Sequence, residues 1–86
     1  LKIKGESMIN AQINDGDIVL IRQQSDVDNG QIAAVLIDDS ATLKRVYHMD
    51  GVIQLQAENP QYPPMIYSKN NCDECRILGL AVAVLG

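Results

Sequence analysis

Turn-forming residues recur along the whole chain and keep every regular element short. Clusters of Asn, Asp, Gly and Pro lie at positions 14–17, 28–30, 38–40, 50–51, 59–60, 63–64 and 69–71. The runs between them are rich in Ile, Val and Leu and cover 18–22, 31–37, 41–47, 52–56, 65–67 and 77–85. Short strands at this spacing, with turn residues between them, predict an antiparallel sandwich or barrel. We therefore expect an all-β fold with at most one short helical turn, beginning near Ser7.

Size and composition limit the chain to one small core. A domain of 86 residues buries only about 60% of the surface of its unfolded chain. Hydrophobic residues make up 47% of the sequence, yet Phe and Trp are absent. The core must therefore be built from Ile, Val, Leu, Ala and Tyr, which favours strands. We expect one domain over residues 1–86.

The charge of the chain argues against a surface that binds nucleic acid directly. Its formal net charge is −4, whereas affinity for phosphates requires clustered Lys and Arg. No apolar stretch is long enough to span a bilayer, and no secretion signal begins the sequence. We expect a cytoplasmic protein. The first residue is Leu1 and not Met, which suggests a fragment of a longer polypeptide whose missing part would bind any DNA.

Cysteine usage fits a reducing compartment. Cys72 and Cys75 are too close together for a conventional disulfide framework. Structural zinc takes four Cys or His ligands, and the single histidine, His48, is distant in sequence. We expect incidental surface thiols and no metal or cofactor. A local disulfide, or a metal shared across a dimer, stays open as an alternative.

A hairpin around residues 38–40 would place Lys44 in its second strand. Because strand side chains alternate between faces, Lys44 shares a face with Thr42 and Val46, and Arg45 points the opposite way. Neither face is purely apolar, so alternation does not say which one is buried. In the last strand, Leu78, Leu80, Val82 and Val84 would line one face. The other face, Gly79, Ala81 and Ala83, would let another backbone approach closely.

Ser7 is a candidate nucleophile. It follows Gly5 and Glu6 at a predicted strand-to-turn junction. A serine hydroxyl attacks only when a base removes its proton, and the backbone N–H groups at the start of a helical turn can stabilise an oxyanion. The alternative structural role for Ser7 is to cap that turn.

Two side chains could act as the base. His48 lies in a polar stretch, residues 47–51, that is typical of a turn tip, which argues against a Ser-His-Asp triad. A lysine can act as base if burial lowers its pKa well below the ~10.4 of a free amine. Lys44 is the candidate, and its alternative role is that of a solvated lysine on an edge strand.

Seven segments, in order along the chain, resemble the LexA and UmuD family of self-cleaving serine peptidases. They are GESM (5–8), INDGDIV (13–19), NGQI (29–32), IDD (37–39), ATLKRV (41–46), ENP (58–60) and ILG (77–79). The most specific are the Gly-x-Ser-Met and Thr-x-Lys-Arg blocks, whose Ser7 and Lys44 lie 37 positions apart (44 minus 7). The resemblance covers nearly the whole chain and implies a LexA-type fold, related to that of signal peptidases.

The resemblance also implies the chemistry. In the family, a serine in the first block attacks a peptide bond of its own chain, and a lysine in the second block takes the serine's proton. By position these residues are Ser7 and Lys44. The backbone N–H of Ser7, together with that of Glu6, would form the oxyanion site.

A regulatory role follows from the same resemblance. Family members are two-part repressors: an N-terminal helix-turn-helix binds DNA, and the C-terminal peptidase domain forms a homodimer. A RecA filament on single-stranded DNA promotes self-cleavage, which relieves repression in the SOS response or during prophage induction. The helix-turn-helix is absent from this sequence. So is the cleavage site, a small residue followed by Gly well before the serine, and we therefore expect cleavage only in trans.

Three alternatives remain open. A signal peptidase shares the Ser-Lys chemistry, although it usually has a membrane anchor and a proline soon after the methionine. A dimerisation domain without enzymatic activity would keep the fold alone. An accessory subunit of a polymerase, like UmuD, would differ only upstream of Leu1. In addition, the segment Cys72-Asp73-Glu74-Cys75 has no counterpart in the family pattern, so the regulatory partner could belong to a phage or another mobile element.

Overall fold

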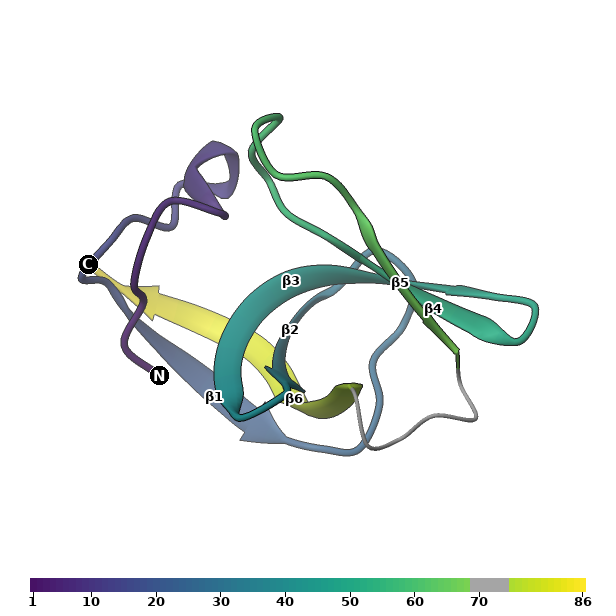
Figure 1. Ribbon diagram of the computed structural model, residues 1–86. Helices are drawn as coiled ribbons and strands as arrows, with labels where there is room; N and C mark the ends of the chain where they lie inside the picture. Colours follow the sequence, from purple (N-terminus) through teal and green to yellow (C-terminus); the bar gives the residue numbers. More distant parts are fainter. Residues whose placement is uncertain (69–74) are drawn as a thin grey trace.

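The computed structural model of the protein describes residues 1–68 and 75–86 (Figure 1). Its regular elements are one short 3₁₀ helix and six strands. They are η1 (Ile9–Ala11), β1 (Ile18–Gln23), β2 (Ile32–Ile37), β3 (Ser40–Met49), β4 (Val52–Gln56), β5 (Met65–Ser68) and β6 (Cys75–Leu85). All six predicted strands are present, and the all-β prediction is confirmed.

The strands form one antiparallel sheet in the order β1-β6-β2-β3-β4-β5. The last strand in sequence thus lies between β1 and β2. The two ends of the chain lie on the same side of the molecule (Figure 1). We expected an antiparallel sandwich or barrel. Within the described residues the sheet is open, because its edge strands β1 and β5 do not pair with each other.

The predicted hairpin between β2 and β3 is confirmed. Ile37 pairs with Ser40, and only two residues connect them. Asp38 takes a positive φ of 54°, a conformation that Asp tolerates better than most residues and that suits a two-residue hairpin turn. β3 continues to Met49, two residues beyond its predicted end, so His48 lies in a strand and not in a turn.

Two β-bulges in β6 change which of its residues share a face. Pairing with β2 skips Leu78, and pairing with β1 skips Val82. Because an extra residue reverses the alternation of side chains, Leu78 packs against one core cluster and Leu80 against the other. The expectation that these two leucines share a face is therefore wrong.

The core consists of two clusters on opposite faces of the sheet, since neighbours Ala33 and Ala34 of β2 belong to different clusters. The first comprises Ile3, Met8, Ile13, Val19, Ala34 and Leu43. The second comprises Val27, Ala33, Val35, Val46 and Leu55. Half of the first cluster comes from the segment that precedes β1. Its burial, at about 1.5–3 kcal/mol for each large side chain, holds that segment on the sheet.

Backbone hydrogen bonds fix the same segment along the outer edge of β1. Leu1 and Val19 exchange two bonds, of 2.8 and 2.9 Å, and Ile3 N–H donates to Asp17 at 2.8 Å. The chain then crosses toward β3, where Met8 is almost fully buried beside Leu43. This route brings Ser7 next to β3.

Candidate active site

The structure brings Ser7 and Lys44 together. Lys44 Nζ donates a hydrogen bond of 3.2 Å to Ser7 Oγ. Ser7 lies in the irregular segment before η1, and Lys44 lies in the middle of β3. The two residues are far apart in sequence, so only the packing of the N-terminal segment on the sheet makes this contact.

Lys44 occupies a site where a charged amine is disfavoured. Its side chain is buried, with only 8% of the residue exposed. Its amine has two acceptors besides Ser7: Thr42 Oγ1 at 3.3 Å and the Leu43 carbonyl at 3.1 Å. None of the three acceptors carries a charge. Removal from water therefore lowers the pKa of Lys44. The alternative role of a solvated edge lysine is excluded, and Lys44 can act as a proton acceptor.

Ser7 does not cap the helical turn. η1 begins only at Ile9, its N-cap is Met8, and no side chain caps it. The Ser7 hydroxyl instead takes the hydrogen bond from Lys44. Nearby, Gly5 has φ of 83°, a conformation that glycine adopts without steric cost. Gly5 N–H donates to Asp15 Oδ1 at 2.6 Å, which anchors the bend before the serine.

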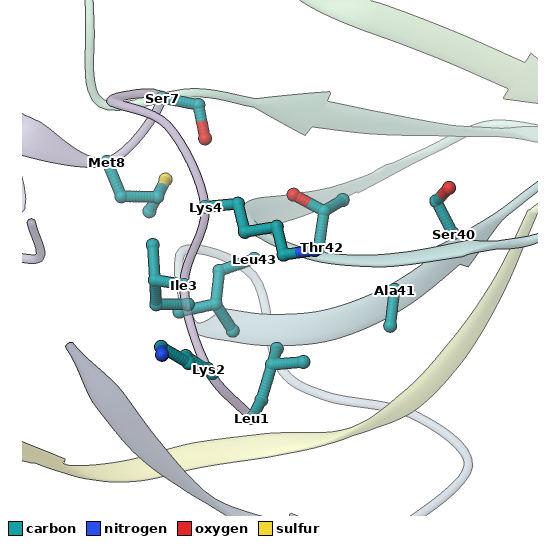
Figure 2. Close-up of a pocket in the computed structure, with 10 residues that line it drawn as sticks. All are labelled: Leu1, Lys2, Ile3, Lys4, Ser7, Met8, Ser40, Ala41, Thr42 and Leu43. Carbon is teal, nitrogen blue, oxygen red and sulfur yellow. The ribbon is translucent and has the colours of Figure 1, made fainter. Parts of the chain in front are cut away.

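A hollow of about 500 Å³ opens beside Ser7 (Figure 2). It is lined by Leu1, Lys2, Ile3, Lys4, Ser7, Met8, Ser40, Ala41, Thr42 and Leu43. One wall is the N-terminal segment and the other is the first half of β3. Pairing between β3 and β4 begins only at Arg45, so the described strands leave one edge of Ser40–Leu43 unpaired next to the serine.

Arg45 points away from Lys44, as strand alternation predicted. Its Nε lies 2.5 Å from Glu58 Oε1, and its guanidinium also donates to the Gly30 carbonyl. Glu58 in turn accepts, through its backbone carbonyl, the N–H of Asn10 at 2.8 Å. Arg45 thereby fixes the loop around Glu58, which contacts the segment that contains Ser7.

Asn59 makes the second contact between these two segments. Its Nδ2 donates to the carbonyl oxygen of Glu6 at 2.8 Å. Glu58 and Asn59 lie within a segment that resembles the family, but sequence alone assigned neither residue a role. The only local signal was the turn-forming Asn-Pro pair, which does not say that residue 59 lies against residue 6.

The structure separates His48 from the Ser7 site. His48 Nε2 lies 2.8 Å from the Val27 carbonyl and 3.1 Å from Asp26 Oδ1. It is only partly exposed, so the expected solvated loop histidine is wrong, but its neighbours do not include Ser7. Cys72 lies outside the described residues. Cys75 is half-buried against the second core cluster, and burial raises the pKa of its thiol.

Comparison with known proteins finds one family and several relatives that match nearly the whole chain. Residues 1–82 match the Peptidase S24-like family. The LexA repressor of Desulfitobacterium hafniense is 48% identical over 84 residues, which are 98% of this chain and 39% of that protein. The LexA repressor of Frankia alni is 51% identical over 99% of this chain and 32% of its own length. That of Magnetococcus marinus is 42% identical over 100% and 36%.

The alignments cover this chain and its relatives to different extents. This chain aligns almost completely, yet it spans only about a third to two-fifths of each of these relatives. The aligned region includes both Ser7 and Lys44, because the family match runs from residue 1 to residue 82. The chain therefore belongs to the Peptidase S24-like family.

Proposed function

We propose that this chain is a serine endopeptidase domain of a LexA-like repressor, in which Ser7 is the nucleophile and Lys44 the general base. One observation carries the proposal: the buried Lys44 amine, with its lowered pKa, lies 3.2 Å from the Ser7 hydroxyl. A neutral amine at hydrogen-bond distance from a hydroxyl meets the geometric requirement for general base catalysis.

The proposed reaction uses both residues in turn. Neutral Lys44 takes the proton of Ser7 as Oγ attacks the carbonyl carbon of the scissile bond. The Ser7 N–H stabilises the oxyanion, and the Lys44 ammonium then donates its proton to the leaving amine. Water, which Lys44 deprotonates in turn, then attacks the ester carbon. The bond from that carbon to Ser7 Oγ breaks, and the Lys44 ammonium returns the proton to Oγ, which restores both residues. No second ionisable side chain is needed.

The substrate binds in the hollow beside Ser7. An extended peptide there can add to the unpaired edge of Ser40–Leu43, since a free strand edge offers backbone donors and acceptors in register. By its resemblance to the family, the substrate is a small residue followed by Gly in the protein's own linker. Cleavage would separate a DNA-binding part from this domain, under the control of a RecA filament.

We also propose that the domain pairs with a second copy through the outer end of β1 and β6. Two cross-strand pairs there, Ile18 with Leu85 and Leu20 with Ala83, share one face of the sheet. Ile18, Leu20 and Leu85 are each about half exposed, which is unusual for neighbouring apolar side chains. Ala81 packs on the first core cluster instead, so Ala83 and Leu20 are the better positions for a test. Leu20→Glu should convert a dimer to monomers in sedimentation.

A peptide with a central Ala-Gly bond tests the peptidase. The rate of cleavage by the 86-residue chain should rise with pH until Lys44 has lost its proton, with a midpoint below the ~10.4 of a free lysine. A rate that is independent of pH would mean that the base is wrongly assigned. No cleavage at any pH, together with dimerisation, would favour the alternative of a dimerisation domain without enzymatic activity.

The remaining parts of the proposal concern the whole protein. Over residues 1–68 and 75–86 there is no helix long and apolar enough to cross a membrane. We propose that the protein acts in the cytoplasm and binds DNA through a segment outside these 86 residues, because the net charge of −4 does not suit a DNA-binding surface.

A further inference from the structure

We infer that Asn59 is a positioning residue for the oxyanion site, an inference that rests on the proposed peptidase function. Its Nδ2 donates to the carbonyl oxygen of Glu6 at 2.8 Å, across 53 positions of sequence. That carbonyl belongs to the same peptide group as the N–H of Ser7. Asn59 therefore binds the carbonyl side of this peptide group, and the N–H on the opposite side would face the oxyanion.

Because a peptide group is planar, this contact determines the direction of the Ser7 N–H. The Glu6–Ser7 bond is trans, and in a planar trans peptide the carbonyl and the following N–H point in opposite directions. Fixing the Glu6 oxygen therefore fixes the direction of the Ser7 N–H. A hydrogen bond to the oxygen also polarises the peptide group and strengthens the N–H as a donor.

The segment needs such a contact because it lacks regular structure. Residues 4–8 belong to no helix or strand. The Glu6 oxygen has one other donor, the Ile9 N–H, at a longer 3.3 Å. Within the described residues the Ser7 N–H donates to no protein acceptor, so nothing on its own side fixes its direction before substrate binds.

Asn59 is itself held rigidly. Its Oδ1 accepts the N–H of Gln61 at 3.0 Å, and Pro60 restricts the backbone between them. The two amide atoms cannot be exchanged, because the Glu6 oxygen can only accept and the Gln61 N–H can only donate. A side chain fixed at one end loses little entropy when the other end binds Glu6.

Asn59→Asp isolates the donor. Aspartate keeps the Oδ1 acceptor that builds the turn, but it presents a second oxygen to the Glu6 carbonyl in place of Nδ2. Removing a complete oxyanion donor costs about 10²–10³ in kcat. Because the Ser7 N–H is misdirected here and not lost, we expect kcat to fall roughly 10- to 100-fold, with KM changed less than about threefold.

Two further variants test whether the loss of kcat comes from the missing donor and not from the added charge or from an altered turn. Gln61→Glu adds the same charge two residues away and should keep wild-type kcat. Asn59→Ala removes the donor without adding charge and should lower kcat as Asn59→Asp does. The pH midpoint, which reports on Lys44, should be the same in all four proteins. The inference is overturned if Asn59→Asp retains wild-type kcat, if Gln61→Glu loses as much, or if the loss lies in KM or in a shifted pH midpoint.

A measurement that does not depend on catalysis tests the role of Asn59 separately from the peptidase proposal. In NMR spectra of the folded chain, Asn59→Asp should shift the Ser7 amide and the Glu6 carbonyl carbon, whereas Gln61→Glu should leave both in place. If wild-type protein fails to cleave peptide, the peptidase proposal fails, and these shifts still decide whether Asn59 orients the group. Unchanged resonances in Asn59→Asp would refute the inference by itself.

Discussion

Ser7 and Lys44 face each other across one hydrogen bond but are held by different kinds of structure. Lys44 lies in β3, where Ala33 of β2 is its direct neighbour and β4 pairs from the next residue onward. Ser7 lies in a segment of irregular backbone. Single hydrogen bonds from the Gly5 N–H to Asp15 and from Asn59 to Glu6 hold that segment, together with the burial of Met8.

This difference separates activity from stability. The hydrogen bonds between paired strands form cooperatively, so a substitution near Lys44 also disturbs the packing of the core around it. An individual side-chain contact can be removed without unfolding the domain, and at an exposed position it contributes only about 0.5–1.5 kcal/mol. We therefore expect that substitutions around Ser7 alter catalysis more than stability, whereas those in the sheet alter both.

The largest effects are expected from substitution of Ser7 and Lys44 themselves. Ser7→Ala and Lys44→Ala should each lower peptide cleavage at least about 10³-fold, equivalent to roughly 4 kcal/mol of transition-state stabilisation. Ser7→Ala should leave the melting temperature nearly unchanged, because it removes one hydroxyl from a half-buried position. Cleavage assays and thermal melts check both. Persistent activity in Lys44→Ala across pH 6–10 would contradict the assignment of the base.

The next prediction disturbs the sheet at a distance from Ser7. A Cβ on Gly79 would lie 2.3 Å from the Arg22 carbonyl oxygen and 2.6 Å from Ile21 Cγ2. The strands must shift to relieve these contacts, so Gly79→Ala should destabilise the domain by about 2–3 kcal/mol. The disturbance should also reach Lys44, because Gly79 pairs with Ala34 and Ala34 with Leu43.

A glycine in open space provides the control for this substitution. Gly86 has no atom within 4 Å of its added Cβ, so Gly86→Ala should leave stability unchanged. Urea unfolding of the two variants measures the difference. Equal stability of Gly79→Ala and wild type would show that β1 and β6 do not approach as closely as described.

A smaller effect concerns the stability cost of burying an amine. Burial lowers the pKa of Lys44 in the folded state, so the folded protein binds this proton less tightly than the unfolded chain. The resulting destabilisation is full below the folded pKa and fades as pH rises through the unfolded value of ~10.4. Lys44→Met should therefore be more stable than wild type near pH 7, by about 1 kcal/mol, and the difference should shrink by pH 10–11.

Unfolding by urea at pH 7 and pH 10 tests the sign. Lys4→Met, which removes an exposed amine from the same region, is the matched control. An inactive Lys44→Met that is less stable than wild type at pH 7 would mean that the hydrogen bonds of the amine outweigh its desolvation.

The smallest effect is expected at the only histidine. His48→Gln removes a contact of 3.1 Å between Nε2 and Asp26 Oδ1, whose side chain is 66% exposed, and exposed contacts of this kind contribute about 0–1 kcal/mol. Because its partners lie away from Ser7, cleavage should remain within about twofold of wild type at every pH. A much larger loss of cleavage would instead implicate His48 in catalysis.

The sequence by itself determined the strands and the residue types of the site. Turn clusters and β-prone runs placed six strands within a few residues of their observed bounds, because backbone propensity and turn chemistry act locally. The alternation of side chains along 41–47 also placed Lys44 and Arg45 on opposite faces. The resemblance of two short blocks to a peptidase family then selected Ser7 and Lys44 from several serines and lysines.

Only the tertiary structure decided how these pieces meet. The bulges at Leu78 and Val82 reversed the faces of β6, since bulges form where two strands must adjust to each other. The burial of Lys44, and with it the direction of its pKa, depends on the N-terminal segment that packs over β3. The contact of Asn59 with Glu6 joins positions 53 residues apart. Propensity and spacing describe neighbours in sequence, whereas these three features arise between segments that only the folded chain brings together.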